Sequence, residues 1–407
     1  MTSAPVTLDD VHRAGRLLGD VAERTPVQRS RWLEQLVQAP VSLKCEHLQR
    51  TGSFKIRGAY VRIAGLPPDA RRRGVVAASA GNHAQGVALA ATLLDTQSTV
   101  FMPRGAPIPK ERATRGYGAD VHFAGSNVDE ALIAARAFAS RTGAVGIHPF
   151  DHPDVVAGQG TLGLEILEQV PDVATVLVPC GGGGLLAGVA TAIKAVRPEV
   201  RVVGVQAEEA ASYPTSLDAG HPVALQSMRT MADGIAVGRP GDVPFEAVRR
   251  LVDDILTVSE ESLSRALLLL LERAKQVVEP GGAAAVAALL EHGAGGALSA
   301  GPVVAVLSGG NIDPLLLMRV MRHGMAAAGR YLSFVTRLTD RPGELAELLG
   351  LLADAQANVV DVLHQRVSPH LNVHEVELAL RVETRGDTHR EAVVATLRAA
   401  GHPVSIL

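Results

Sequence analysis

Residues 175–196 of the chain read TVLVPCGGGGLLAGVATAIKAV. The apolar run TVLVP predicts a strand covered on both faces, and LLAGVATAIKAV predicts a helix. Four consecutive glycines, Gly181 to Gly184, join the two. Backbone amides at such a turn are unshielded by side chains and lie at the positive end of the helix, so they form a site for a phosphate. A simple tight turn needs only one or two glycines, so we favour the phosphate site.

The same alternation of short β-branched runs and long Ala/Leu-rich stretches continues from residue 70 to 310. This order is typical of βαβ units, so it predicts an α/β fold with a parallel sheet. The expected strands are Val75–Ala80, Thr99–Pro103, Asp120–Ala124, Thr175–Pro179, Arg201–Gln206 and Val303–Leu307. Ligands of such folds bind at the carboxyl ends of the strands, where the glycine-bearing turns SAGNHAQG, CGGGGLLAG and LSGGN occur.

A different pattern begins after residue 330. The stretch YLSFVTRLTD alternates like a half-exposed strand, and RPGELAELLGLLADAQ predicts a helix that begins with proline. Two further strands, a helix and a last strand follow. This βαββαβ order is that of a ferredoxin-like module of roughly 75 residues. We therefore expect a domain boundary near residue 330.

Composition excludes several classes of function. With 407 residues, 47% hydrophobic and 20% charged, the chain is long enough for two or three domains. A net charge of −3 gives no basic surface for nucleic acid. No segment reaches the ~20 apolar residues that span a bilayer, and the start MTSAPVTLDD lacks the order of a signal peptide. Cys45 and Cys180 predict free thiols, so we expect a cytoplasmic protein. From the charge and the apolar segments we expect no nucleic-acid partner and no membrane partner.

A single lysine helps to identify the phosphate ligand. The glycine loop alone leaves a nicotinamide cofactor open, because residues 182–187 satisfy the G-x-G-x-x-A pattern and Glu208 follows at a distance suited to a ribose. Lys55, however, lies between the apolar residues Phe54 and Ile56. Apolar surroundings lower the pKa of an amine toward the neutral form that Schiff-base chemistry requires. An anion-binding turn combined with such a lysine favours pyridoxal phosphate as the cofactor.

Four motifs in this order, SFKIRGA, SAGNHAQGVA, CGGGGLLAG and SGGN, resemble those of the fold type II pyridoxal phosphate enzymes, most closely the threonine/serine dehydratases. The resemblance covers about residues 5 to 325. It implies two α/β subdomains with parallel sheets, like the β subunit of tryptophan synthase, within a catalytic domain at 1–325. The stretch TRLTDRPGELAELLGLLADAQANV is similar to ACT domains, which implies an amino-acid-sensing domain at 331–407.

The resemblance also implies roles for individual residues. Lys55 would hold the cofactor covalently and then act as the catalytic base at the substrate Cα. The implied cofactor contacts are Phe54, Lys55, Asn82, Gly181, Gly182, Gly183, Gly184, Leu185 and Ser308. The implied substrate contacts are Ser79, Ala80, Gly81, Asn82 and His83. For His83 itself we favour a structural role over that of a general base.

Two positions bear on the reaction. Ser308 matches the family's partner to the pyridine nitrogen, and a serine hydroxyl makes the ring a weaker electron sink than a carboxylate does. The implied chemistry is β-elimination, which converts L-threonine to 2-oxobutanoate and ammonia, and serine to pyruvate as a side activity. Racemases of this fold carry a second serine where this chain has Ala80, whose methyl group cannot exchange a proton. Serine racemase, a nicotinamide-dependent dehydrogenase and a non-catalytic amino-acid sensor are the alternatives.

One departure from the family concerns metal binding. Some relatives hold a cation with a glutamate at the position of Gln206, and a neutral amide is a poorer ligand for a hard cation. We therefore assign no metal. Glu208 and Glu209 are the alternative ligands for a cation, but we favour their interpretation as exposed loop acids. Asp233 and Glu279 lie in stretches that resemble cofactor-side loops, but the sequence assigns them no chemistry.

The similarity to ACT domains implies an amino-acid effector, with isoleucine or valine as the expected ligand. The strand-to-helix turn at Asp340 and Gly343 offers amides to a carboxylate, and Asn358 lies at the start of the next strand. The alternative is an oligomerisation module without a ligand. In either case we expect a homo-oligomer, either a dimer or a tetramer.

Overall fold

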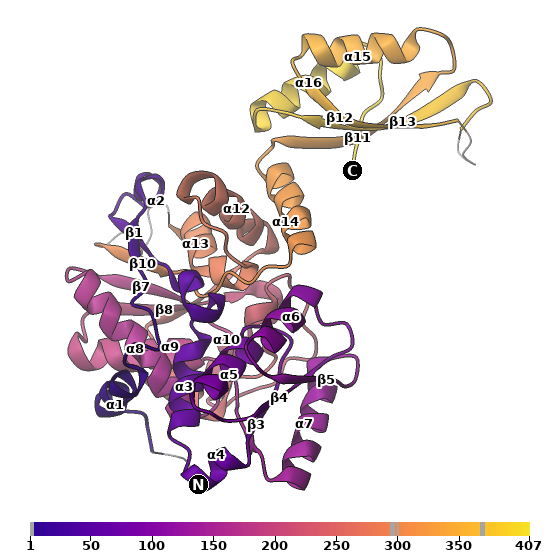
Figure 1. Cartoon of the computed structure of the whole chain (residues 1–407). Coiled ribbons are helices and arrows are strands. Elements are labelled where there is room, and N and C mark those ends of the chain that lie inside the picture. Colours follow the sequence, from indigo (N-terminus) through magenta and orange to yellow (C-terminus); the bar gives the residue numbers. More distant parts are fainter. Residues whose placement is uncertain (1–3, 294–297, 299–300, 367–370) are drawn as a thin grey trace. The chain divides into compact units, whose positions relative to one another are not determined.

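The computed structural model describes residues 4–293, 298, 301–366 and 371–407 of the chain (Figure 1). The chain forms two compact units, Met1–Pro314 and Leu315–Leu407, called here the N-terminal and C-terminal units. The domain limits expected from the sequence, 1–325 and 331–407, stay a prediction for limited proteolysis to test.

The larger sheet of the N-terminal unit has six strands in the order β1-β2-β10-β7-β8-β9. These are β1 Val27–Arg29, β2 Val41–Lys44, β10 Val303–Val306, β7 Thr175–Pro179, β8 Arg201–Ala207 and β9 Asp254–Val258. Neighbouring strands are parallel except for the edge strand β1, which pairs antiparallel with β2. The parallel sheet that the sequence predicted is therefore present, with one antiparallel strand at its edge.

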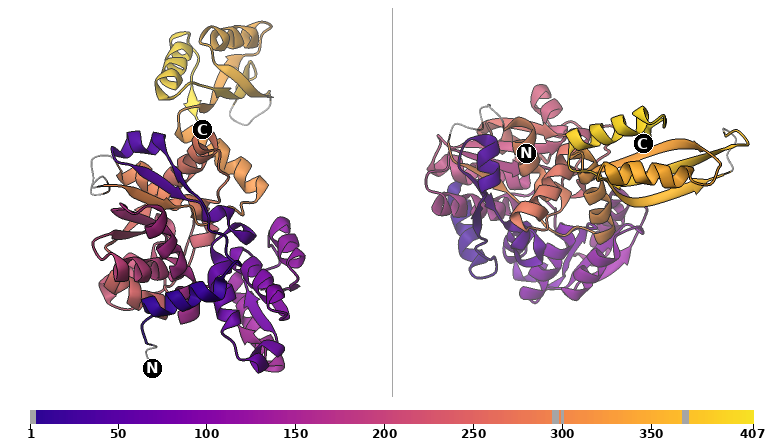
Figure 2. Two further views of the ribbon diagram at one scale, coloured as in Figure 1. Left: turned by 60° about the vertical axis from the view of Figure 1, so that its left-hand side comes forward. Right: turned by 90° about the horizontal axis from the view of Figure 1, so that it is seen from above.

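The smaller sheet of this unit has four parallel strands in the order β5-β4-β3-β6. These are β5 Asp120–Phe123, β4 Ser98–Met102, β3 Val75–Ala78 and β6 Val145–Gly146. In the left view of Figure 2, the purple segments of this sheet and its helices lie beside the magenta segments around the larger sheet. The fold is therefore an α/β unit with two sheets, as the sequence predicted.

The helices of the N-terminal unit lie mainly in the connections between strands. They are α1 Leu8–Leu18, α2 Arg31–Val37, α3 Lys55–Ala64, α4 Pro68–Arg72, α5 Asn82–Leu93, α6 Ile108–Gly116, α7 Val128–Thr142, α8 Pro153–Gln169, α9 Gly184–Val196, α10 Ser212–Ala219, α11 Asp242–Leu251, α12 Glu260–Leu269 and α13 Pro280–His292. Val176 and Val178 of β7 pack with α8 and α9 in one core, and α13 packs on the strands β7 to β10 as well. No helix in the described part of the chain is both long and apolar enough to cross a membrane.

The C-terminal unit contains α14 Pro314–Ala327 from Leu315 onward, and then a βαββαβ module. Its elements are β11 Tyr331–Thr339, α15 Glu344–Asp354, β12 Asn358–Gln365, β13 Glu375–Glu383, α16 Asp387–Ala399 and β14 Ser405–Ile406. The sheet order is β12-β13-β11-β14, and its paired strands are antiparallel. Buried leucines of both helices, Leu348 and Leu397, share a core with Phe334 and Leu380 of the sheet. The predicted ferredoxin-like order is confirmed.

Candidate active site

A cavity of about 1040 Å³ lies in the N-terminal unit and is lined by residues that follow β3, β7 and β10. Ligands of open α/β sheets bind at these carboxyl ends. The structure brings all the cofactor and substrate contacts expected from the sequence to this cavity: Phe54, Lys55, Ser79, Ala80, Gly81, Asn82, His83, Gly181, Gly182, Gly183, Gly184, Leu185 and Ser308. Their individual roles stay predictions.

The glycine loop before α9 has no room for side chains. Gly183 has a φ of +98°, and a Cβ on it would lie 1.8 Å from the hydroxyl oxygen of Tyr213. A Cβ on Gly182 would lie 2.4 Å from the Phe150 ring. The loop therefore presents bare backbone at the cavity, next to the positive end of α9. This arrangement fits a phosphate group.

Lys55 is the first residue of α3 and borders the cavity. Its Nζ donates a hydrogen bond to the carbonyl oxygen of Pro149 at 3.0 Å and lies 5.0 Å from the centre of the Phe54 ring. Burial lowers the pKa of Lys55 to about 8, although the charge of Glu279 opposes the shift. A useful fraction of the amine is therefore neutral near pH 7, as a nucleophile requires.

Buried ion pairs fix the helix that carries this lysine. Arg57 of α3 is 1% exposed and donates to both oxygens of Glu46 at 2.9 Å. It also donates to Oε1 of Glu165 on α8 at 2.6 Å, and the fully buried Lys44 of β2 donates to Oε2 of the same side chain at 2.6 Å. Two positive and two negative side chains thus join α3, β2 and α8. This network holds the backbone of Lys55 in place.

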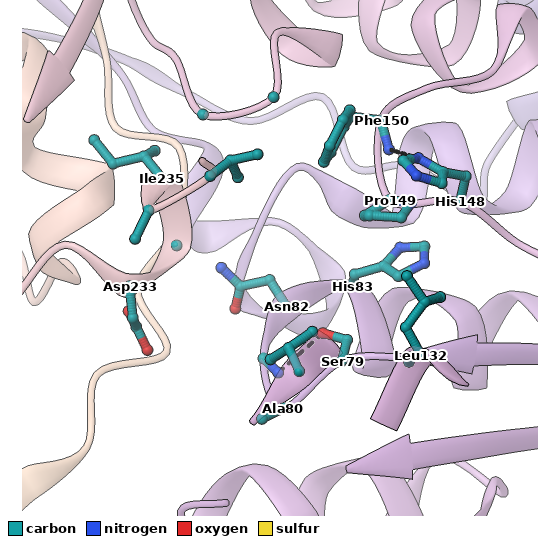
Figure 3. A pocket seen from close by; sticks show the side chains of 18 of the residues that line it. Ser79, Ala80, Asn82, His83, Leu132, His148, Pro149, Phe150, Asp233 and Ile235 are labelled. Atoms are coloured by element: carbon teal, nitrogen blue, oxygen red, sulfur yellow. Dashed lines mark hydrogen bonds between the residues drawn. The ribbon is translucent and has the colours of Figure 1, made fainter. Parts of the chain in front are cut away.

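The first turn of α5 forms another wall of the cavity (Figure 3). The hydroxyl of Ser79 accepts a hydrogen bond from the Gly81 N–H at 3.1 Å. The Nε2 atom of His83 contacts the carbonyl oxygen of Ile147 at 2.8 Å, and since a carbonyl only accepts, Nε2 carries the proton. Burial, aided by the charge of Lys55, lowers the pKa of His83 to about 3, so this side chain stays neutral.

Charged groups that the sequence left without a role also line the cavity. Lys110 of α6 donates to Oδ2 of Asp233 at 2.8 Å, and so links the small-sheet part of the unit to the turn after α10. Glu279 is 3% exposed, and burial together with the charge of Asp233 raises its pKa to about 7. The sequence pointed to Glu279 only through the resemblance of its stretch to a cofactor-side loop. Nothing in the sequence pointed to Lys110.

The position expected to disfavour a cation has its own hydrogen bond. Gln206 is fully buried, and its Oε1 accepts from the Tyr213 N–H at 2.9 Å. Glu208 and Glu209 are exposed in the short turn that follows β8. No cluster of three or more His, Cys, Asp or Glu side chains suited to a metal occurs among the described residues.

Comparisons with known proteins agree with this geometry. The family described as pyridoxal-phosphate dependent enzyme matches residues 19–309. This chain belongs to that family. A second match, to the ACT domain, covers residues 333–402. Pyridoxal phosphate is the cofactor of this enzyme, and the cavity supplies the groups it needs: an amine, a bare anion-binding turn and the hydroxyl of Ser308.

Individual relatives match this pyridoxal-phosphate enzyme over most of its length. A protein of Thermotoga maritima named L-threonine ammonia-lyase is 46% identical over 402 residues, which cover 99% of this chain and 100% of the relative. A solved T.th. threonine deaminase is 46% identical, with a TM-score of 0.71, and the match covers 75% of this chain and 99% of that one. Maize serine racemase is 35% identical, with a TM-score of 0.75 over 78% of this chain and 97% of that one.

The residues expected to bind an effector do not meet within one chain. Asp340 follows β11, and Gly343 has a φ of +103° just before α15. Asn358 pairs with Glu383, which in turn pairs with the first residue of β11. Because β11 has nine residues, Asn358 and the Asp340–Gly343 turn lie at opposite ends of the sheet, roughly 25 Å apart. These residues therefore do not form one site within a single chain, and their role in effector binding stays a prediction.

Proposed function

We propose that this enzyme is a threonine ammonia-lyase that converts L-threonine to 2-oxobutanoate and ammonia, with serine giving pyruvate more slowly. The observation that carries the proposal is the Nζ of Lys55, which lies in the same cavity as the bare glycine loop, Ser308 and the first turn of α5. The Thermotoga maritima relative and the solved T.th. structure support the substrate, because both are 46% identical to this chain and both are named for threonine.

The chain's own residues have separate tasks in this reaction. Bound pyridoxal phosphate supplies an electron-withdrawing ring that acidifies the Cα–H bond of an amino acid joined to it. The loop 181–184 and the Leu185 amide would bind its phosphate, Phe54 would pack on its ring, and Ser308 would contact its ring nitrogen. Lys55 would hold the cofactor covalently until the substrate amine displaces it, and the freed Lys55 amine would then take the proton from Cα as a base.

The first turn of α5 holds the substrate in this proposal. The N–H groups that begin a helix have no partner within it, so Asn82 and His83 offer donors to the α-carboxylate. The side chain of Ser79 adds a hydroxyl. With the carboxylate fixed there, the Cα proton would be held toward Lys55. The β-hydroxyl would leave as water by taking up a proton, which the protonated Lys55 amine can return to it. The enamine product then tautomerises and hydrolyses in solution.

The alternatives differ in what they require of the cavity. Racemisation needs a second group that exchanges a proton on the opposite face of Cα, and at Ala80 this chain offers a methyl group. A nicotinamide cofactor loses its support because the chain belongs to a pyridoxal phosphate family and Glu208 is exposed. A sensor without catalysis would have no use for a Lys55 amine with a lowered pKa.

The test compares products from the two hydroxy amino acids. We expect 2-oxobutanoate from L-threonine, a lower rate of pyruvate from L-serine, and little D-serine. The Lys55→Ala variant should fold and lose turnover. D-serine formed faster than pyruvate would favour the racemase, and no product from either substrate in a cofactor-loaded enzyme would refute the lyase.

We also propose that the ACT domain binds isoleucine or valine between two copies of the chain. A ligand in contact with both Asp340–Gly343 and Asn358 requires two chains, because one chain holds these groups at opposite ends of its sheet. This requirement supports a homo-oligomer. Added isoleucine should raise the thermal midpoint of the full chain but not of Asn358→Ala, and no shift with either amino acid would contradict the proposal.

The two buried free cysteines support the cytoplasmic location.

A further inference from the structure

Residues from four distant segments of the sequence meet in one chain of hydrogen bonds beside the cavity. The Nδ2 atom of Asn311, in the loop after β10, donates to the carbonyl oxygen of Thr51 at 2.7 Å and to Oδ1 of Asn82 at 2.8 Å. The Nδ2 atom of Asn82 then donates to Oε1 of Glu279 at 2.6 Å. Thr51 precedes α3, Asn82 begins α5, and Glu279 precedes α13. Glu279 and Asn82 both line the cavity.

The direction of this chain is determined by the group at its end. The backbone carbonyl of Thr51 can only accept, so the nitrogen of the Asn311 amide faces it. That nitrogen has two hydrogens, and the second one points to Asn82. The Asn82 oxygen must therefore accept, which turns its nitrogen toward Glu279. An asparagine amide alone has two nearly equivalent orientations, and this chain selects one of them.

The surroundings leave little freedom for the chain to rearrange. Thr51 has a φ of +67°, a left-handed conformation that non-glycine residues seldom adopt unless their surroundings impose it. A Cβ on Gly52 would lie 2.3 Å from Oδ1 of Asn311, and a Cβ on Gly309 would lie 2.4 Å from Oε1 of Glu279. The backbone thus packs directly against the side chains at both ends, and the strained turn places the Thr51 carbonyl against Asn311.

The two ends of the chain differ in how they respond to protons. Glu279 faces Asn82 of α5, Lys55 of α3, Lys110 of α6 and Asp233 of the turn after α10, and its pKa is raised to about 7. Glu279 therefore becomes protonated as pH falls through 7, and its carboxyl oxygen then accepts the hydrogen bond from Asn82 more weakly. The Thr51 carbonyl does not titrate, so the Asn311 end keeps the same direction on both sides of that pH.

We propose that Asn311, supported by Glu279, positions the Asn82 amide so that the second hydrogen of Nδ2 faces the cavity as the donor to the ring oxygen of pyridoxal phosphate. Asn311 and Glu279 are positioning residues that act through Asn82. This inference rests on the proposed function and on the cofactor contact that the resemblance to the family implies for Asn82. It assigns a function to the asparagine of the SGGN motif and to a buried carboxylate that sequence patterns left without one.

A double-mutant cycle on the full-length chain tests the proposal. The dissociation constant of pyridoxal phosphate is measured by absorbance for the wild type, Asn82→Ala, Asn311→Ala and the double variant. We expect each single substitution to weaken binding by roughly tenfold, and Asn311→Ala to add less than about twofold once Asn82 is gone. An equal loss from Asn311→Ala with and without Asn82, or no loss at all, would overturn the proposal.

Two further variants test the orientation of the Asn82 amide. Both substitutions nearly keep the size of the original side chain, so they disturb the fold little. Asn311→Asp keeps the size of the side chain but removes its donor, so it should favour the inverted Asn82 amide and weaken binding more than Asn311→Ala. Glu279→Gln should weaken binding by less than about threefold, because the Thr51 end still sets the direction. If Asn311→Asp weakens binding less than Asn311→Ala does, the role of Asn311 is refuted. If Asn82→Ala leaves binding unchanged, the contact proposed for Asn82 is wrong, whereas failure of the lyase activity leaves this binding cycle intact.

Discussion

Removing the guanidinium of Arg57 is expected to destabilise the N-terminal unit strongly. Arg57 and Glu46 are 1% and 0% exposed, and they are joined by two hydrogen bonds of 2.9 Å. In Arg57→Ala, Glu46 keeps a bond of 2.5 Å from the Thr25 hydroxyl but loses its charged partner. Leaving one member of a buried ion pair uncompensated costs about 3–5 kcal/mol of the free energy of unfolding.

This cost converts into a shift that calorimetry resolves. The entropy of unfolding is about 2.1 cal/mol/K per residue, so the unit Met1–Pro314 has about 0.66 kcal/mol/K. A loss of about 3–5 kcal/mol therefore lowers Tm by about 5–8 °C.

The assay is differential scanning calorimetry of the cofactor-loaded full chain, with an exposed pair as the control. Arg249 and Glu246 lie 2.8 Å apart with side chains 50% and 54% exposed. Such surface pairs contribute about 0–1 kcal/mol, so Arg249→Ala should lower Tm by less than about 2 °C. If Arg57→Ala and Arg249→Ala shift Tm equally, the buried network does not stabilise the unit and the reasoning fails.

Three other outcomes are expected. In an equilibrium titration, Gly183→Ala should weaken pyridoxal phosphate binding at least about tenfold, because its Cβ would overlap with Tyr213. Gly116→Ala is the control and should leave binding unchanged, because nothing lies within 4 Å of its Cβ. The rate at which the cofactor-free chain binds pyridoxal phosphate, measured by stopped flow, should rise about tenfold from pH 7 to 9, because the pKa of Lys55 is about 8. A hundredfold rise would indicate a lysine with the usual pKa. Ala80→Ser should raise D-serine formed per pyruvate in chiral chromatography, and an unchanged ratio would contradict the role of Ala80.

Local sequence patterns predicted the elements that position the site. The strand Thr175–Pro179 is observed with the same limits, and the other expected strands begin and end within two residues of prediction. Most of these strands are apolar runs with a glycine or proline close by, so their neighbours in sequence define them. The short strands β1, β2, β6 and β9 were not predicted. They have few residues and no clear alternation, so the sequence does not distinguish them from loops.

Contacts between distant segments could not be predicted in the same way. Asn82, Glu279 and Asn311 bond across separations of 197 and 229 residues, and only the folded sheets bring them together. The opposite is true of the ACT residues. The βαββαβ order already implies that a turn after the first strand and the start of the second strand lie at opposite ends of the sheet, so the distance between Asp340 and Asn358 follows from topology.

All of the proposed chemistry requires that Lys55 holds the cofactor. Borohydride reduction of the yellow holoenzyme, followed by peptide mass mapping, tests it directly. We predict that the mass of reduced pyridoxal phosphate appears on the peptide that contains Lys55 and on no other lysine peptide. The same mass on another lysine, with Lys55 unmodified, would contradict the account.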